Sequence, residues 1–291
     1  MTLKDWYETG YYYRHKDHQI FYQEKPSQHG SGEVLVLLHG FPTASWDWHL
    51  LWEELSLRFH LIAPDFLGFG YSDKPAGQDY HIEEQADLVE ALLAAKGVYK
   101  YHVLAHDYGD TVAQELLARE RERDEALRLQ SVILLNGGLF PETHRPRPIQ
   151  QLLLSPLGPY LTPFLSRRSL RVNFEKIFGP DSPPKPHGID EWWSLINYNN
   201  GRQVFHKLIR YMEERVQQRE RWVKALVQPP VMVRFIVGEA DPISGSHAAR
   251  RYEEVVQRGA DLVRLPRIGH YPQTEAPKEV LTHCWAFWES L

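Results

Sequence analysis

Residues 104–113 of this 291-residue chain read LAHDYGDTVA and contain its strongest structural signal. An apolar strand pattern ends here, small residues stand at Ala105 and Gly109, and helical periodicity begins directly afterwards. A sharp strand-to-helix turn needs small flanking residues because its backbone packs closely against its neighbours. The pattern places Asp107 where a nucleophile elbow usually carries serine. The alternative is an ordinary helix N-cap, a role that is also open to Asp110.

Short apolar runs recur along the chain and read as buried strands. They are residues 33–39, 60–64, 101–105, 131–135, 232–237 and 262–265. Amphipathic helical patterns lie between them, as in residues 82–96, and another helix is expected over 280–287 with Cys284 packed inside it. Strands that are apolar on both faces and alternate with helices indicate a parallel sheet covered on both sides, which is an α/β fold.

This alternation stops once, between about residue 138 and residue 228. The range holds helical segments rich in Trp, Tyr and Leu, and a proline-rich loop over 179–186. We therefore predict an α/β core of residues 1–137 and 229–291 with an inserted helical cap of residues 138–228. The uncharged stretch 148–166 belongs to this cap, because its prolines would break a membrane-spanning helix.

Composition and charge limit the function classes. The chain has 33 Lys and Arg against 38 Asp and Glu, a formal net charge of −5, which gives no electrostatic reason to expect nucleic acid or a membrane as partner. One cysteine and 15 histidines without HExxH-like spacing lead us to expect neither a metal nor another cofactor. The start of the chain lacks an apolar secretory segment, so a cytoplasmic location is expected. The oligomeric state, monomer or homodimer, stays open.

Two further segments place an acid and a base at strand ends. Asp241 follows a buried strand in the sequence GEADP, and His270 follows the last strand in RIGHYP. The chain order nucleophile, acid, histidine is typical of a triad carried at the carboxyl ends of strands in an open α/β sheet. Glu239 is a weaker rival for the acid, and the amide of Asn136, at another strand end, cannot do this work.

Residues 38–43, LHGFPT, come directly after a buried strand. Gly40 permits a sharp turn there, and the backbone N–H of Phe41 can point toward the site. Together with the N–H of Tyr108, it forms the predicted oxyanion hole. His39 is expected to support this loop structurally and not to act as a base.

Four motifs resemble the α/β-hydrolase superfamily: residues 39–43 (HGFPT), 65–75 (DFLGFGYSDKP), 106–110 (HDYGD) and 269–271 (GHY). Within it, they are similar to the epoxide hydrolases and haloalkane dehalogenases that use an aspartate nucleophile. The resemblance covers nearly the whole chain, including the cap. It implies the α/β-hydrolase fold, with a mostly parallel eight-stranded sheet, helices on both faces and an inserted cap.

The resemblance also separates two reactions. Haloalkane dehalogenases hold the halide with a tryptophan after the nucleophile and often an asparagine after the His-Gly pair, where this chain has Tyr108 and Phe41. Epoxide hydrolases donate to the departing oxygen from cap tyrosines. This implies Tyr211 as a catalytic donor, with Tyr160 and Tyr198 as candidates for a second donor at the substrate.

The predicted function is therefore hydrolysis of a small apolar epoxide by water. Asp107 forms an alkyl-enzyme ester, and His270, oriented by Asp241, activates the water that cleaves it. Trp193 is a candidate for the substrate cavity, although Trp193 and Trp192 cannot both face one side of a helix. The alternatives are dehalogenation by the same nucleophile and a catalytically silent binding protein with a hydrolase fold.

Overall fold

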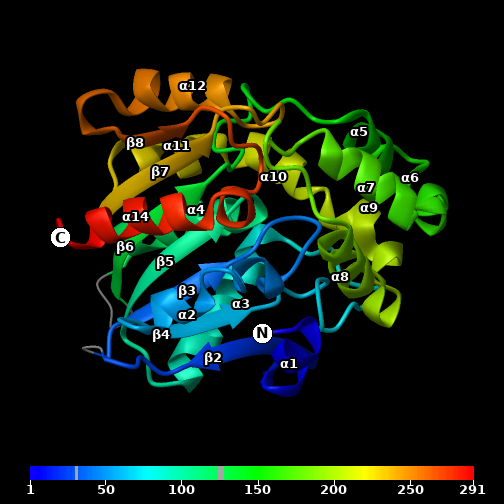
Figure 1. Ribbon diagram of the computed structural model, residues 1–291, viewed down its shortest axis with the longest axis horizontal. Helices are drawn as coiled ribbons and strands as arrows, with labels where there is room; N and C mark the ends of the chain where they lie inside the picture. Colours follow the sequence, from blue (N-terminus) through cyan, green and yellow to red (C-terminus); the bar gives the residue numbers. More distant parts are fainter. Residues whose placement is uncertain (30–31, 124–127) are drawn as a thin grey trace.

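An eight-stranded sheet forms the centre of the protein (Figure 1). The computed structural model describes residues 1–29, 32–123 and 128–291. The strand order is β1-β2-β4-β3-β5-β6-β7-β8, with β1, β2 and β4 paired antiparallel and the other pairs parallel. The bounds are β1 (Tyr11–His15), β2 (His18–Lys25), β3 (Val34–Leu38), β4 (His60–Pro64), β5 (Lys100–His106), β6 (Arg128–Leu135), β7 (Met232–Gly238) and β8 (Asp261–Leu265). This confirms the predicted α/β-hydrolase architecture and its mostly parallel sheet.

The central strands are apolar on both faces, and their side chains alternate between two cores. All five residues of β3 are buried. Val36 and Leu38 face one core, whereas Leu35 and Leu37 face the other. This period of two follows from the pleat of a strand, and it explains why each central strand reads as an unbroken apolar run.

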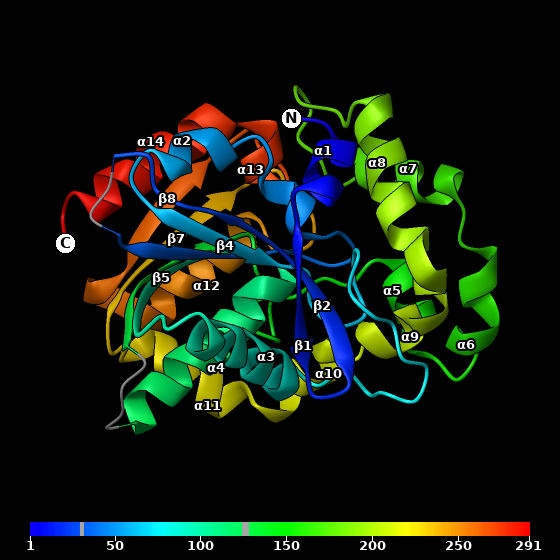
Figure 2. The ribbon, with the colours of Figure 1, turned by 90° about the horizontal axis from the view of Figure 1, so that it is seen from below.

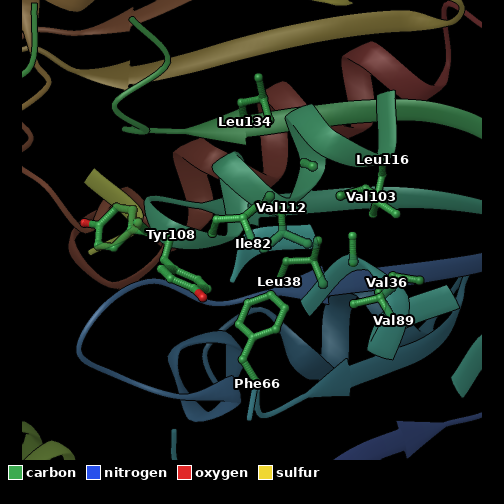
Figure 3. Packing of buried hydrophobic residues seen from close by; sticks show 14 of the residues in the cluster. Val36, Leu38, Phe66, Ile82, Val89, Val103, Tyr108, Val112, Leu116 and Leu134 are labelled. Carbon is green, nitrogen blue, oxygen red and sulfur yellow. The ribbon is translucent and has the colours of Figure 1, made fainter. Parts of the chain in front are cut away.

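Helices cover both faces of the sheet, as Figure 2 shows from below. One face is covered by α3 (Ile82–Ala95), α4 (Tyr108–Glu122), α11 (Arg219–Val227) and α12 (Ser246–Val256). The other is covered by α1 (Leu3–Glu8), α2 (Trp52–Ser56), α14 (Pro277–Trp288) and the short elements η1 (Ser45–Trp48) and α13 (Pro272–Glu275). A further short turn, η4 (Gln257–Gly259), follows α12. Figure 3 shows side chains of α3 and α4 packed in one cluster with those of β3, β5 and β6.

The helical cap lies beyond one end of the central strands (Figure 1). Its elements are α5 (Pro148–Leu154), α6 (Gly158–Leu161), η2 (Thr162–Phe164), α7 (Arg167–Glu175), α8 (Pro186–Asn197), η3 (Tyr198–Val204), α9 (Phe205–Leu208) and α10 (Tyr211–Gln217). Within the range predicted as cap, α11 lies against α4, and its Trp222 and Leu226 pack in the cluster on that face of the sheet. In the described ranges, no helix is both long and apolar enough to cross a membrane.

Candidate active site

Asp107 stands alone between the end of β5 and the start of α4, with φ 47° and ψ −100°. This backbone conformation is strained for a residue with a side chain, by about 1–3 kcal/mol, and persists where the surroundings hold it. The neighbouring glycines allow the chains to pack this closely. A Cβ on Gly109 would lie 2.3 Å from the backbone oxygen of Leu38, and one on Gly40 would lie 2.6 Å from His106 Nδ1. The tight turn expected from the small residues is therefore present.

Asp107 is only 4% exposed, and the two oxygens of its carboxylate have different surroundings. The backbone N–H of Phe41 donates to Oδ2 over 3.1 Å. Tyr108 is the first residue of α4, and N–H groups in the first turn of a helix have no acceptor within the helix. The geometry thus suits Oδ2 to an oxyanion hole at Phe41 and Tyr108, and leaves Oδ1 as the oxygen that could attack a substrate.

His39 holds the loop that carries Phe41. Its Nε2 accepts the backbone N–H of Phe66 over 3.1 Å, so its Nδ1 carries the proton and donates to the backbone oxygen of Gly40 over 2.9 Å. Burial lowers the pKa of His39 to about 3, which keeps the ring neutral. This arrangement fits the supporting role expected for His39.

His270 and Asp241 form a buried pair at the ends of β8 and β7. The His270 Nδ1 donates to Asp241 Oδ2 over 2.7 Å, and the two residues are 3% and 2% exposed. Burial by itself would lower the pKa of His270, but the charges of Asp241 and then Asp107 raise it to about 9. Burial would raise the pKa of Asp107, but the charges of His270 and then Arg215 hold it below its usual value. At neutral pH the free protein therefore holds an aspartate anion and a histidine cation.

Asp241 is fixed by several donors besides His270. Its Oδ1 accepts the N–H of Ile243 over 2.8 Å, and its Oδ2 accepts the N–H of Ser244 over 3.1 Å and Nδ2 of Asn136 over 3.0 Å. Burial would raise the pKa of Asp241, but His270 and these donors lower it to about 2. Asn136 thus supports the acid. Sequence reasoning excluded Asn136 as the acid itself but missed this supporting role.

Glu239, the other acid considered for this position, forms an ion pair with Arg264. Asp241 is therefore the carboxylate of this loop that meets His270.

Glu275 ties the loop of the histidine to the cap. Its carboxylate accepts the backbone N–H groups of Gly269 and Tyr271 over 2.9 and 3.0 Å, and that of Gly179 over 2.7 Å. The backbone N–H of His270 also donates to the oxygen of Ile177, just after α7, over 2.8 Å. Ser182 Oγ also donates to the Glu275 carboxylate over 2.6 Å. Sequence reasoning missed Glu275 because its partners Gly179 and Ser182 lie far from it in the chain.

An arginine of the cap reaches Asp107. Arg215, in α10, is 2% exposed, and its Nη2 lies 3.6 Å from Asp107 Oδ1. The predicted donor Tyr211 precedes it by one helical turn and is 1% exposed, with its ring 5.0 Å from that of Tyr108 and 6.2 Å from that of Phe41. The hydroxyl of Tyr211 has no hydrogen-bond partner among the described residues. Sequence reasoning missed Arg215, which stands in a run of charged residues that reads as a solvated helix.

A cavity of about 790 Å³, counted out to its open mouth, lies between the core and the cap. Asp107 and His270 both line it, and so does Trp193. Most of its other walls are apolar side chains of the loop after β3 and of the cap, among them Phe41, Ile149, Leu153, Leu165, Leu170, Phe174, Ile196 and Phe205. This lining favours a substrate with an apolar body.

The other predicted cap residues lie elsewhere. Tyr160 is 74% exposed, and Tyr198 packs its ring 5.0 Å from that of Tyr71. Neither belongs to the cavity lining, nor does Tyr211. Trp192 points away from Trp193 and donates from its indole N–H to Asp47 over 2.9 Å, so adjacent tryptophans do face different sides. The structure thus brings Trp193 to the cavity but not the three tyrosines.

The side chain that follows the nucleophile also turns away from the cavity. The ring of Tyr108 lies 5.4 Å from that of Phe66 and 5.1 Å from that of Phe69, in an apolar cluster. Phe41 contributes a benzyl side chain without a donor. In the described ranges, no group of three or more His, Cys, Asp or Glu residues has the geometry of a metal site.

The fold identifies the class of protein, which is that of the α/β hydrolases. Residues 35–282 match the model of the alpha/beta hydrolase family, and the chain belongs to this family. It is 41% identical over 295 residues to the mesoderm-specific transcript protein of Mus musculus, covering 98% of this chain and 88% of that protein.

Solved structures share the fold at low identity. A haloalkane dehalogenase DbeA loop variant from Bradyrhizobium elkanii has a TM-score of 0.80 at 17% identity, covering 96% of this chain and 95% of that one. The epoxide hydrolase CorEH has a TM-score of 0.76 at 20% identity, covering 97% and 99%.

Proposed function

We propose that the protein hydrolyses epoxides with an apolar substituent through an ester on Asp107. The observation that carries the proposal is the buried set of Asp107, His270 and Asp241 at one apolar cavity. A carboxylate suits displacement at saturated carbon, because it forms an ester whose carbonyl carbon water can attack. A serine would leave a stable ether at such a carbon.

In the first step, Oδ1 of Asp107 attacks the epoxide carbon and the carbon–oxygen bond of the ring breaks. The lowered pKa of Asp107 keeps the nucleophile ionised, and the pKa of about 9 keeps His270 protonated at neutral pH. The alkoxide that forms takes a proton from His270, which lines the cavity. His270 is then neutral, as the second step requires.

In the second step, neutral His270 takes a proton from water, and the water oxygen adds to Cγ of Asp107. Negative charge gathers on Oδ2, where the backbone N–H of Phe41 already donates over 3.1 Å. Asp241 stabilises the imidazolium that forms. Collapse of this intermediate releases the diol and restores the carboxylate.

The source of the first proton differs from the sequence-based prediction. Tyr211 packs against Phe41 and Tyr108 but does not itself line the cavity, whereas His270 lines it and has a proton to give. Tyr211→Phe is therefore expected to form the ester at a rate within about threefold of the unchanged protein, since no cavity donor is lost. A much larger loss would return the donor role to Tyr211.

Two features favour an epoxide over a haloalkane. A departing halide needs N–H donors at the cavity, but Tyr108 packs in an apolar cluster and Phe41 has no donor side chain. Dehalogenation by the same nucleophile stays the second candidate, because its first step also yields an ester on Asp107. A silent binding protein would keep the cavity but form no ester.

The experiment is intact-protein mass spectrometry of His270→Gln protein after brief exposure to a panel of epoxides and bromoalkanes. This variant should retain the ester because it lacks the base for the second step. It also lacks the imidazolium that protonates the alkoxide in the first step, so that proton comes from water and the ester should form more slowly, but still form. An adduct equal to the whole epoxide supports the proposal, and Asp107→Ala/His270→Gln is the control that should show none. An adduct of the alkyl group without bromine would indicate a dehalogenase. No adduct with any compound would favour the silent protein.

A further inference from the structure

A buried arginine of the cap is held against the proposed nucleophile. Besides the 3.6 Å contact with Oδ1, Nη2 of Arg215 donates to the backbone oxygen of Asp107 over 3.0 Å. Its Nε donates to Thr111 Oγ1 over 2.8 Å, within the first turns of α4. Its guanidinium carbon lies 4.5 Å from the centre of the Tyr211 ring. These contacts fix the cation on the elbow itself.

Other charges near Arg215 do not explain why it is buried there. Burial and then Arg215 lower the pKa of His144 to about 3, so this ring is neutral. Burial and then Asp107 raise the pKa of Asp110 well above its usual value, which favours its uncharged form, and Asp110 makes no ion pair with Arg215 in the described ranges. Within the described ranges, Asp107 is the carboxylate paired with Arg215, and Nη1 has no hydrogen-bond partner. Burying a guanidinium with an unused N–H group is costly, which calls for a compensating role.

The position of Arg215 has opposite effects on the two proposed steps. A positive charge beside Oδ1 stabilises the free carboxylate, and therefore weakens it as a nucleophile during ester formation. During ester hydrolysis, Oδ1 is the oxygen that leaves with the alkyl group and gains negative charge as its bond to Cγ breaks. A fixed cation beside Oδ1 stabilises that developing charge.

We propose that Arg215 is a further catalytic residue, which stabilises Oδ1 as the leaving oxygen when the ester on Asp107 is hydrolysed. This inference rests on the proposed function. Water adds to Cγ and gives a proton to His270, and Oδ2 carries the negative charge. The Cγ–Oδ1 bond then breaks, and Oδ1 takes the proton from His270 and departs in the product alcohol. The water oxygen stays in the new carboxyl group of Asp107, whose proton passes to His270, while Arg215 keeps all its protons.

The test compares the two steps by rapid-quench intact mass spectrometry, with an epoxide that labels His270→Gln protein. Arg215→Met is expected to form the ester at an unchanged or higher rate and to hydrolyse it about 10²-fold more slowly. The adduct should therefore accumulate although His270 is intact. Arg215→Lys, which keeps the charge, should recover part of the hydrolysis rate. Arg219→Met is the matched control, because Arg219 pairs with Glu142 at the surface and should leave both rates unchanged.

Equal slowing of both steps in Arg215→Met, or an unchanged ester lifetime, would overturn the proposal. If this variant does not fold, Thr111→Val replaces it, since it removes the oxygen that orients Nε. That variant should lengthen the ester lifetime several-fold while ester formation keeps its rate, and an unchanged lifetime would again overturn the proposal. No adduct on His270→Gln protein would refute the proposed function and this inference together. An adduct there with normal turnover of Arg215→Met would refute the role of Arg215 alone.

Discussion

The two regions that meet at Asp107 hold their buried charged residues differently, as Asp241 on one side and Arg215 on the other show. On the side of the sheet, Asp241 accepts hydrogen bonds from His270, Ile243, Ser244 and Asn136. On the side of the cap, Nη1 of Arg215 and the hydroxyl of Tyr211 have no partner in the described ranges, although both residues are buried. Asp241 is thus held in one geometry by several donors, whereas the cap presents two buried donors that have no acceptor.

The largest effect is expected at Asp107, where the two regions meet. Asp107→Ala removes the atom that forms the ester, so turnover should fall by about 10⁴-fold or more. Steady-state rates with the epoxide that labels His270→Gln protein measure this, and circular dichroism checks that the fold is kept. Full turnover in Asp107→Ala would refute ester formation and leave the cavity as a binding site.

The next effect tests the sheet side. Asp241→Ala removes the partner that orients His270, and should lower turnover by about 10³- to 10⁴-fold. Glu239→Ala is its matched control, because that carboxylate lies in the same loop but pairs with Arg264. Comparable losses in both variants would show that the loop, and not the contact with His270, determines the rate.

The pKa of His270, and its dependence on the charge of Asp107, predict how ester hydrolysis varies with pH. His270 acts as a base only when neutral, and its pKa in the free protein is about 9. The ester removes the negative charge of Asp107, so the pKa of His270 should then lie below 9. The decay rate of the ester should therefore rise by up to about tenfold per pH unit above pH 6, and level off before pH 9. A rate that falls with rising pH in single-turnover measurements would contradict His270 as the base.

The smallest expected effects distinguish a cap residue that lines the cavity from one on the outer surface of the cap. Trp193→Ala removes an indole from the cavity lining and should raise KM by about tenfold, because lost apolar contact weakens substrate binding. Tyr160→Ala changes a ring that is 74% exposed and should shift KM by less than about twofold. A larger effect at Tyr160 than at Trp193 would mean that substrate binds on the outer surface.

Much of the sheet side could be predicted from the sequence, because its signals are local. The six apolar runs match β3 to β8. Asp107 follows β5 directly, and Asp241 and His270 lie in the loops after β7 and β8. In contrast, β1 and β2 were not recognised individually because many of their residues are polar or exposed. The roles assigned to the three site residues stay predictions, although the structure brings their side chains together.

The cap side could not be predicted in the same way. Arg215 lies in the sequence EERVQQRER, where nothing local distinguishes the one buried arginine from its exposed neighbours. Its place is decided by how α10 packs on the elbow, which depends on contacts far apart in the chain. The resemblance of the cap predicts Tyr160 and Tyr198 as substrate contacts. In the structure, α6 and η3 are packed so that neither residue lines the cavity.

The carboxylate of Glu275 also bears on how the protein opens. It holds Gly179, in the loop between α7 and α8, to Gly269 and Tyr271 on either side of the proposed base. These amides should exchange slowly with solvent deuterium, because their release requires several hydrogen bonds to open at once. Substrate entry and product release should then proceed by motion of cap elements away from this anchor, such as α5 and α6, which is slower than side-chain rotation. His270, the proposed base, can thus keep its position relative to Asp241 while the cavity opens and closes.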